Sequence, residues 1–337
     1  MEYLITGGAG FIGSHLADEL LRRGNHVTVI DDLSTGSIQN IEDLRSNSNF
    51  KFVQDTVMNR PLMSELVDRA EVIFHLAAAV GVRLVVESPL NAITTNVAAT
   101  QVLLGLAMKG QTVVITSSSE VYGKSEKVPF SEGDGLLLGP PDKLRWSYGC
   151  SKAINEFFAL ASWRERGVRT IVVRLFNTIG PHQTGHYGMV VPRFVGQALA
   201  GEALMVYGDG RQTRCFGWVG DVVNAMIALS EHPGAVGKVF NVGGEEEVTI
   251  NELAERIKRL SDSHSSIKHV PYHEVYNSEF EDMRRRVPDL RRINDLIGYK
   301  PTKTLDEMLF AIITFTRDKA QSLRSRSLRE YASPTLS

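Results

Sequence analysis

The stretch "YLITGGAGFIGSHL" near the start of the chain constrains the fold more than any other part of the sequence. Its glycines, Gly7, Gly10 and Gly13, directly follow an apolar, strand-like run and open a helical segment. Glycines at these positions let the backbone turn tightly and approach a pyrophosphate, whose charge is favoured at the helix N-terminus. Strand, glycine turn and helix together predict a dinucleotide-binding βαβ unit.

The first half of the chain alternates short apolar runs with helical segments. Helices are expected over residues 14–23, 97–108 and 148–166, and strands at "YLIT", "HVTVI", "EVIFHLA" and "TVVITSS". Two more strands, at 169–177 and 238–244, come from distant parts of the chain. This rhythm predicts an α/β fold with a Rossmann-type, doubly wound parallel sheet.

The sequence also suggests how the chain divides into lobes. We expect residues 1–176 to form a nucleotide-binding lobe, to which 215–244 returns. Residues 177–214 and 245–315 differ in composition, with many glycines, prolines and aromatic residues in the first and an Arg-rich loop in the second. They are expected to form a smaller C-terminal α/β substrate lobe. Residues 316–337 are polar enough to be a frayed or disordered tail.

Charge and composition favour a small-molecule ligand. Thirty-seven Lys and Arg against 39 Asp and Glu leave a net charge of −2, so no basic field attracts nucleic acid or an anionic membrane. No apolar run approaches the roughly 18 residues of a membrane span, and the chain begins with a strand instead of a signal segment. The two cysteines, Cys150 and Cys215, are too few for a disulfide framework or a metal cluster. We therefore expect a cytoplasmic protein without a metal site.

The second strand ends at Asp31, which comes 18 residues after Gly13. A carboxylate there can accept hydrogen bonds from the adenosine ribose and would repel a 2′-phosphate. No Lys or Arg occurs between Asp31 and Asn40 to bind such a phosphate, so the sequence favours NAD over NADP. Asp55, after "FKFVQ", is a candidate contact for the adenine amine, with an exposed loop aspartate as the alternative.

Tyr148 and Lys152 are the candidate catalytic pair. They are four residues apart and therefore share one face of a helix. An ammonium beside a phenol stabilises the phenolate, which predicts a lowered pKa for Tyr148 and a base that can take a proton from an alcohol. A hydroxyl at Ser118 or Ser119, at the end of a central strand, would orient the reacting oxygen.

Four motifs in order, "GGAGFIG", "SSSEVYG", "YGCSK" and "RLFNTIGP", resemble the extended short-chain dehydrogenase/reductase family, in its nucleotide-sugar epimerase, dehydratase and decarboxylase branch. The resemblance covers residues 1 to about 315. It implies a nucleoside-diphosphate-sugar substrate and an NAD that is recycled within one turnover. The cofactor contacts that we predict are Gly7, Gly10, Phe11, Ile12, Gly13, Asp31, Asp32, Ser34, Gly36, Asp55, Leu76, Ala77, Ala78, Tyr148 and Lys152.

The resemblance also suggests the substrate contacts. In the family, the asparagine that matches Asn177 contacts the diphosphate, although a turn-forming asparagine is the alternative here. Tyr207 offers a surface for the base, with Arg214 nearby. Of the three consecutive arginines 284–286, Arg286 best matches the family arginine that binds the pyrophosphate, whereas runs of arginine are usually solvated. The full predicted set is Arg83, Arg145, Asn177, Val191, Tyr207, Arg214 and Arg286.

Glu120, in "TSSSEVYG", carries the prediction of the reaction. Sugar 4,6-dehydratases of the family commonly carry Asp-Glu in this motif, whereas this chain has Ser119-Glu120, and many 4-epimerases have a small or hydroxyl residue in place of the glutamate. Ser-Ser-Glu most closely resembles the UDP-glucuronic acid decarboxylases. The stretch "GPPDKLRWSYGCSK" and Arg214 in "TRCF" are similar to the decarboxylase domain of the bacterial polymyxin-resistance enzyme.

This resemblance implies that C4 of UDP-glucuronic acid is oxidised, that carbon dioxide is lost, and that UDP-xylose or a UDP-4-keto-pentose is released. The catalytic set would be Ser118, Ser119, Glu120, Tyr148, Lys152 and Arg214. Arg214 would hold the substrate carboxylate or serve the enolate. Glu120 would protonate C5 or push the carboxylate out of the carbonyl plane, and the sequence leaves both open. A helix-capping or surface acid is the structural alternative.

Two other functions compete with the decarboxylase. "AAAVGVRLVVESPL" and "TTNV" resemble the UDP-sugar 4-epimerases, in which Arg83 and Arg145 could hold a carboxylate in the carbonyl plane. An NAD-sensing binding protein without turnover is disfavoured because Tyr148 and Lys152 are both present.

The family pairs two helices from each subunit, which predicts a homodimer formed by residues 97–108 and 148–166. The apolar residues considered for this interface are Leu103, Leu104, Ile154, Phe157 and Phe158.

Overall fold

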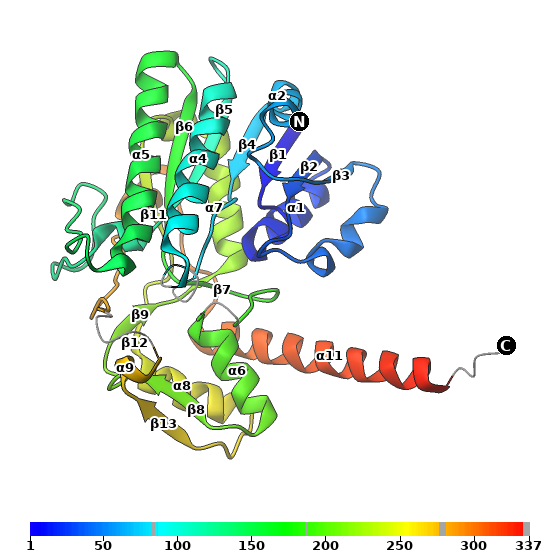
Figure 1. Ribbon diagram of the computed structural model, residues 1–337, viewed down its shortest axis with the longest axis vertical. Coiled ribbons are helices and arrows are strands. Elements are labelled where there is room, and N and C mark those ends of the chain that lie inside the picture. Colours follow the sequence, from blue (N-terminus) through cyan, green and yellow to red (C-terminus); the bar gives the residue numbers. More distant parts are fainter. Residues whose placement is uncertain (82–84, 86, 186–187, 276–280, 333–337) are drawn as a thin grey trace.

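The computed structural model describes residues 1–81, 85, 87–185, 188–275 and 281–332. Its larger lobe is built on a seven-stranded sheet in the order β11-β6-β5-β4-β1-β2-β3, with every neighbouring pair parallel (Figure 1). This order confirms the predicted Rossmann-type, doubly wound sheet. The strands are β1 (Glu2–Thr6), β2 (His26–Asp31), β3 (Phe50–Gln54), β4 (Val72–His75), β5 (Thr112–Ser118), β6 (Arg169–Leu175) and β11 (Val239–Val242).

Helices cover both faces of the sheet because alternate strand residues point to opposite sides. In β1, Tyr3 and Ile5 pack into one core and Leu4 into the other. The first core includes residues of α1 (Phe11–Arg22), α7 (Val219–Glu231) and α10 (Arg291–Ile297). The second includes residues of α2 (Arg60–Arg69), α4 (Pro89–Leu106) and α5 (Ser147–Arg166).

The smaller lobe has its own apolar core, which includes Phe194, Leu253 and Leu309. In it, β8 pairs with β13 in parallel and β9 pairs with β12 antiparallel. The bounds of its elements are α6 (Val190–Ala200), β8 (Leu204–Tyr207), β9 (Thr213–Cys215), β12 (Glu247–Thr249), α8 (Ile250–Leu260), β13 (Ile267–Val270), α9 (Tyr272–Val275) and α11 (Leu305–Ala332).

Two short strands lie where the chain passes between the two lobes. β7 (Thr178–Ile179) pairs in parallel with β10 (Gly217–Trp218), immediately before the chain enters α7. The remaining turns are 3-10 helices: η1 (Ile38–Asn40), η2 (Glu42–Ser46), η3 (Ser119–Tyr122), η4 (Leu144–Trp146) and η5 (Pro233–Ala235).

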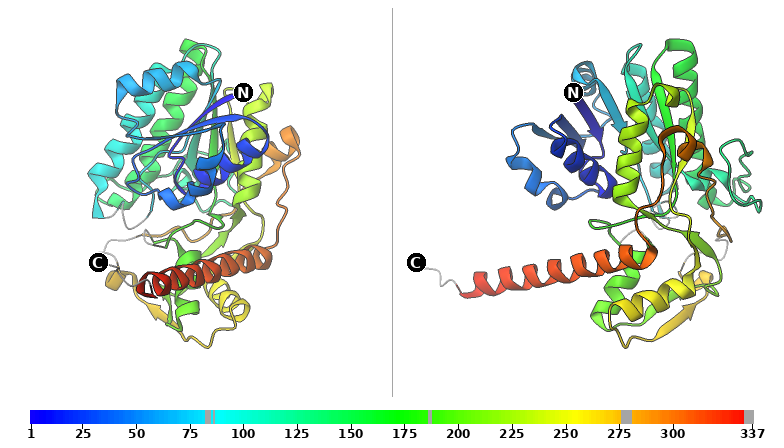
Figure 2. Two further views of the ribbon diagram at one scale, coloured as in Figure 1. Left: turned by 90° about the vertical axis from the view of Figure 1, so that its right-hand side faces the viewer. Right: turned by 180° about the vertical axis from the view of Figure 1, so that it is seen from behind.

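The C-terminal segment differs from the expected irregular tail. Helix α11 continues through Ala332, so the described part of residues 316–337 is helical. Its first turns pack in the core of the smaller lobe through Leu305, Met308 and Ile312. The rest projects beyond the body of the molecule (Figures 1 and 2). Among the described residues, no helix is long and apolar enough to cross a membrane.

Candidate active site

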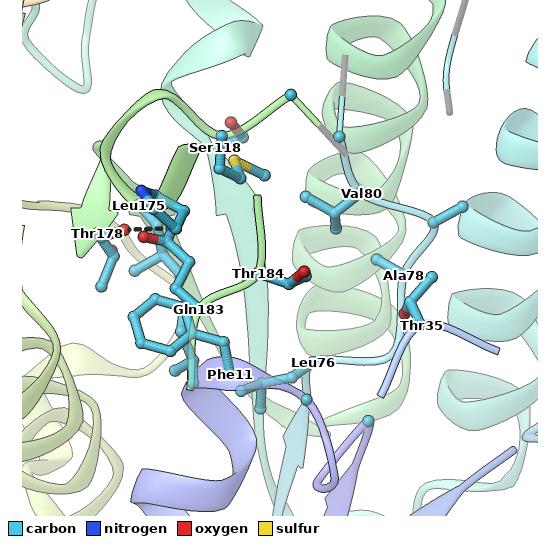
Figure 3. Close-up of a pocket in the computed structure, with 18 of the residues that line it drawn as sticks. Phe11, Thr35, Leu76, Ala78, Val80, Ser118, Leu175, Thr178, Gln183 and Thr184 are labelled. Atoms are coloured by element: carbon cyan, nitrogen blue, oxygen red, sulfur yellow. Dashed lines mark hydrogen bonds between the residues drawn. The ribbon is translucent and has the colours of Figure 1, made fainter. Parts of the chain in front are cut away.

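A cavity of about 1260 Å³ lies between the two lobes. This volume exceeds that of a pocket for one drug-sized ligand and allows two ligands side by side. All the predicted cofactor contacts border it, as do the predicted substrate contacts that the structure describes. Arg83 lies outside the described residues. In Figure 3, Ser118 and Leu175 lie on one side of the cavity and Ala78 and Val80 on the other.

The glycine motif forms a close turn between β1 and α1. Gly7 has φ +72°, and a Cβ there would lie 2.7 Å from the backbone nitrogen of Ala77. A Cβ on Gly13 would lie 2.4 Å from the carbonyl oxygen of Gly7. Helix α1 begins after Gly10 without a side-chain cap, so its first backbone N–H groups are available beside the cavity for an anion. These residues fit a dinucleotide pyrophosphate.

Asp31 ends β2 at the border of the same cavity. Its carboxylate accepts hydrogen bonds from the backbone N–H of Ala9 at 2.9 Å and of Leu33 at 2.8 Å. Burial raises the pKa of Asp31, and these two N–H groups oppose that effect. A Cβ on Gly36 would lie 2.9 Å from the carboxylate. Asp31 is therefore fixed at a position that suits a ribose. Asp55 accepts from the N–H of Thr56 and from Asn59.

Tyr148 and Lys152 lie on α5 and border the cavity. The Lys152 Nζ donates to the carbonyl of Thr116 at 3.0 Å. Burial lowers the pKa of Lys152 to about 8, although the charge of Glu156 opposes the shift. The sequence predicted a lowered pKa for Tyr148, and this is wrong for the structure as described. Burial raises the pKa of Tyr148 to about 12, and only a hydrogen bond with Ser118 opposes it.

The structure separates the two candidate hydroxyls at the end of β5. Ser118 borders the cavity, and its Oγ accepts from the backbone N–H of Glu120 at 3.2 Å. Ser119 is fully buried, does not border the cavity, and receives a 3.4 Å contact from Arg286. Ser118 is therefore the hydroxyl that a bound ligand could reach.

Glu120 lies in a buried cluster of charges at the cavity wall. Arg145 donates to it at 2.5 Å, and Arg286 donates to its other carboxylate oxygen. The cap of η3 is Ser118, not Glu120. The alternatives of a surface acid and of a helix-capping acid are therefore wrong.

Asp282 is a second acid in this cluster, and sequence reasoning missed it. It accepts two hydrogen bonds of 2.9 Å from Arg214 and one of 3.2 Å from Arg145. Burial alone would raise the pKa of Asp282, but the two guanidinium groups hold it below its usual value. The only signal in the sequence is the position of Asp282 just before the arginine run.

Arg214 is largely occupied by protein groups. Besides Asp282, it donates to the carbonyl oxygens of Thr213 at 2.8 Å and Met283 at 2.9 Å. These bonds fix the guanidinium against the protein, so a substrate carboxylate would have to compete with Asp282 for it.

The three consecutive arginines have different surroundings. Arg284 is exposed, and Arg285 pairs with Glu247 at the surface. Arg286 is buried beside the cavity and donates to Asn177 at 3.4 Å. Burial lowers the pKa of Arg286 to about 10, and its Nε has no hydrogen-bond partner among the described residues. Because Arg286 borders the cavity, its guanidinium is a candidate contact for an anionic ligand.

The far end of the cavity is bordered by Val191 and Tyr207. The guanidinium of Arg193 lies 4.0 Å from the centre of the Tyr207 ring. Arg193, which also borders the cavity, was not predicted from the sequence. An apolar surface, an aromatic ring and a cation at one end of the cavity suit a nucleotide base and its phosphates.

The sheet, the glycine cradle and the Tyr148–Lys152 pair together define an extended short-chain dehydrogenase/reductase. The family model described as GDP-mannose 4,6 dehydratase matches residues 4–311, and the chain belongs to this family.

Three known proteins place the chain more closely. It is 41% identical to a UDP-N-acetyl-alpha-D-glucosaminuronate decarboxylase of Bacillus cytotoxicus, over 94% of this chain and 97% of that protein. It is 38% identical to UDP-glucuronic acid decarboxylase 1 of Danio rerio, over 93% and 72%. The UDP-glucuronic acid 4-epimerase of Bacillus cereus, solved with UDP-glucuronic acid and NAD, is 28% identical, with a TM-score of 0.85 and coverage of 94% and 99%.

Proposed function

We propose that this protein is an NAD-dependent decarboxylase of UDP-hexuronic acids, with UDP-glucuronic acid as a substrate. One observation carries the proposal: Glu120 borders the same cavity as Tyr148 and Lys152 and is bound by two arginines. The relatives from Bacillus cytotoxicus and Danio rerio are both named as decarboxylases, and they support the same reaction.

Tyr148 is the base of the proposed reaction. Its phenol takes the proton of the C4 hydroxyl, Ser118 orients that hydroxyl and favours the phenolate through its hydrogen bond with Tyr148, and Lys152 lies one helical turn away. Bound NAD supplies the acceptor for the C4 hydride and returns the hydride at the end of the turnover. The resulting 4-ketone is β to the carboxylate on C5. The bond between C5 and the carboxylate can therefore break, with its electron pair moving toward the C4 oxygen.

Glu120 acts after this oxidation. Two guanidinium partners stabilise an ionised carboxylate, so Glu120 is better suited to repel the substrate carboxylate out of the carbonyl plane than to donate a proton. Arg286, which borders the cavity and contacts Asn177, binds the diphosphate there. Loss of carbon dioxide leaves an enolate that takes a proton at C5 from solvent water, and Tyr148 returns its proton to the C4 oxygen when the ketone is reduced.

The cofactor is NAD instead of NADP. Asp31 is fixed by two backbone N–H groups, and a 2′-phosphate beside it would meet a carboxylate. Calorimetry should give tighter binding of NAD than of NADP. Tighter binding of NADP would contradict this part of the proposal.

The sugar is a hexuronic acid, and its substituent at C2 distinguishes two substrates. The Bacillus relative is named for the 2-acetamido sugar and matches this chain over 97% of its own length. The zebrafish relative is named for the 2-hydroxy sugar. We therefore include UDP-N-acetylglucosaminuronic acid as the second candidate substrate.

The proposal is tested by incubating the purified protein separately with the two UDP-hexuronic acids and following the products by mass. A decarboxylase gives a product that is lighter by carbon dioxide, and comparison of kcat/KM for the two sugars identifies the preferred one. A C4 epimer with its carboxylate intact would instead identify a 4-epimerase. That alternative is favoured by the likeness to the Bacillus cereus epimerase.

We also propose a homodimer formed by α4 and α5. These helices pack side by side, and Ile93, Ile154 and Phe157 are exposed on them, with Phe157 70% exposed. Leu103 and Leu104, by contrast, are buried in the core of the sheet, and Phe158 packs against it. Light scattering should give the mass of a dimer, and Phe157→Glu should give a monomer. Phe310→Glu, at an exposed site on α11, is the matched control.

The cysteines support our proposal of a cytoplasmic location. Cys150 and Cys215 are both free thiols, as a reducing compartment would keep them. Fractionation of the source cells with an antibody to the protein tests this location.

A further inference from the structure

The end of β5 contacts α5 at three successive levels. The carbonyl of Thr116 accepts from Lys152, the hydroxyl of Ser117 donates to Glu156 at 2.5 Å, and Ser118 shares a hydrogen bond with Tyr148. Tyr148, Lys152 and Glu156 are spaced by four residues and therefore follow one face of the helix. The proposed reaction uses the first two of these positions and leaves the third without a role.

Glu156 is a buried carboxylate that is fully bound by protein groups. Arg174 on β6 donates to it twice, at 2.9 and 2.7 Å, in addition to the bond from Ser117. Both side chains of this ion pair are about 95% buried. The guanidinium of Arg174 also lies 4.8 Å from the centre of the Tyr122 ring. A planar, bidentate pair of this kind fixes its carboxylate in one orientation.

We propose that Glu156 is a positioning residue for Tyr148 and Lys152: bound to Ser117 and Arg174, it fixes the register of α5 on β5 and places a carboxylate one helical turn beyond Lys152. The proposal rests on the function proposed above, because it concerns the same Tyr148–Lys152 pair. Glu156 does not border the cavity, so it acts through its neighbours and does not touch a ligand.

The charges around Lys152 support this role. Desolvation disfavours the ammonium, and Glu156 is the charge that opposes it. The other titratable groups nearby are His75 on β4, Tyr148 on α5, Arg174 on β6 and Tyr122 in η3. Burial lowers the pKa of His75 to about 3 and raises the pKa of Tyr122 to about 12, so neither changes charge near neutral pH. Burial of the Arg174 guanidinium is outweighed by its pairing with Glu156, which raises its pKa further.

The test is Glu156→Gln, which keeps the size of the side chain and removes its charge. Without this charge, the pKa of Lys152 falls, and we expect the alkaline limb of the kcat profile to move to lower pH by roughly one unit. The pH dependence of NAD dissociation, measured by calorimetry without substrate, should move in the same direction.

Three variants separate this role from a structural one. Ser117→Ala removes one hydrogen bond and leaves the charge, so its alkaline limb should stay in place. Asp221→Asn removes another buried acid, one that accepts hydrogen bonds from Thr302 and does not border the cavity. This variant should lower the stability of the protein without moving the alkaline limb. If Glu156→Gln does not fold, the double variant with Arg174→Gln leaves no unpaired charge and should show a smaller shift in the same direction.

An alkaline limb and an NAD profile that match the wild type in both Glu156→Gln and the double variant would overturn the proposal, even if the rates fall. If the wild type turns over neither UDP-hexuronic acid, the proposed function fails, and the NAD profile alone then decides the role of Glu156.

Discussion

Two buried clusters of charge lie on either side of the Tyr148–Lys152 pair, and they are built differently. Glu156 on α5 and Arg174 on β6 form a closed, bidentate pair that does not border the cavity. At the cavity wall, two acids and three arginines form an open chain in the order Arg286, Glu120, Arg145, Asp282 and Arg214. The first cluster is neutral, whereas the second carries one excess positive charge.

The two clusters are therefore suited to different roles: the Glu156–Arg174 pair supports neighbouring protein groups, and the cluster at the cavity wall can bind a ligand. The Glu156–Arg174 pair does not border the cavity, so it can act only on its protein neighbours, through the hydrogen bond to Ser117 and the charge of Glu156 near Lys152. The open chain instead borders the cavity through Glu120, Arg145, Asp282, Arg214 and Arg286, and it contains one more cation than acids. An anionic ligand would complete this cluster, so substitutions in it should change binding and chemistry more than folding.

The largest effect is expected for Tyr148→Phe, at the residue that both clusters flank. Removing the proton acceptor should lower turnover by about 10³-fold, because the proposed mechanism then has no group to take the proton of the C4 hydroxyl. NAD and the UDP-sugar should still bind, which calorimetry can measure. A rate within a few-fold of wild type would show that another group is the base.

Glu120→Gln should give the next largest effect and tests the open cluster directly. Oxidation at C4 should continue because Tyr148 and Lys152 are unchanged. NADH absorbance should therefore rise after UDP-glucuronic acid is added, while release of carbon dioxide slows by about 10²-fold. If Glu120 only holds the arginines, the oxidation and the release should slow together.

Arg286→Gln should affect binding more than the chemical step. Losing a charged hydrogen-bond donor to the diphosphate should raise the KM for the UDP-sugar by about 10- to 100-fold, with kcat changed much less. Arg285→Gln is the matched control, because Arg285 pairs with Glu247 at the surface. An equal effect of the two substitutions would remove Arg286 from the binding site.

The smallest effect expected concerns pH. Burial lowers the pKa of Lys152 from 10.5 to about 8, so turnover should decline above about pH 8 as the ammonium is lost. Stability should change in the opposite direction. Between pH 8 and 10.5 the unfolded chain binds the proton more readily, so this group makes the free energy of unfolding rise with pH. Lys152→Met should remove both trends, which rate profiles and denaturant titrations can check.

The structural features that depend on local sequence pattern could be predicted from the sequence. The strands, the glycine turn and the face shared by Tyr148 and Lys152 all follow from spacing along the chain. The choice between Ser118 and Ser119 could not be predicted, because β5 ends at Ser118 and the alternation of side chains stops where η3 begins.

The remaining misses are long-range pairs. Asp282 meets Arg145 across 137 positions of the chain, and Glu156 meets Arg174 across 18. Nothing in the periodicity of either segment indicates such a partner. The raised pKa of Tyr148 was missed for a related reason, because burial depends on the folded surroundings and not on helical spacing.

The position of β11 also bears on how the protein is made. This strand pairs with β6, and the core that covers one face of the sheet also includes Met226 from α7 and Ile293 from α10. Until β11 has been translated, the larger lobe therefore has an open edge at β6, and until α10 follows it has an incomplete apolar face. Its folding can finish only after α10 has left the exit tunnel, so the nascent chain exposes strand and core surfaces that chaperones bind.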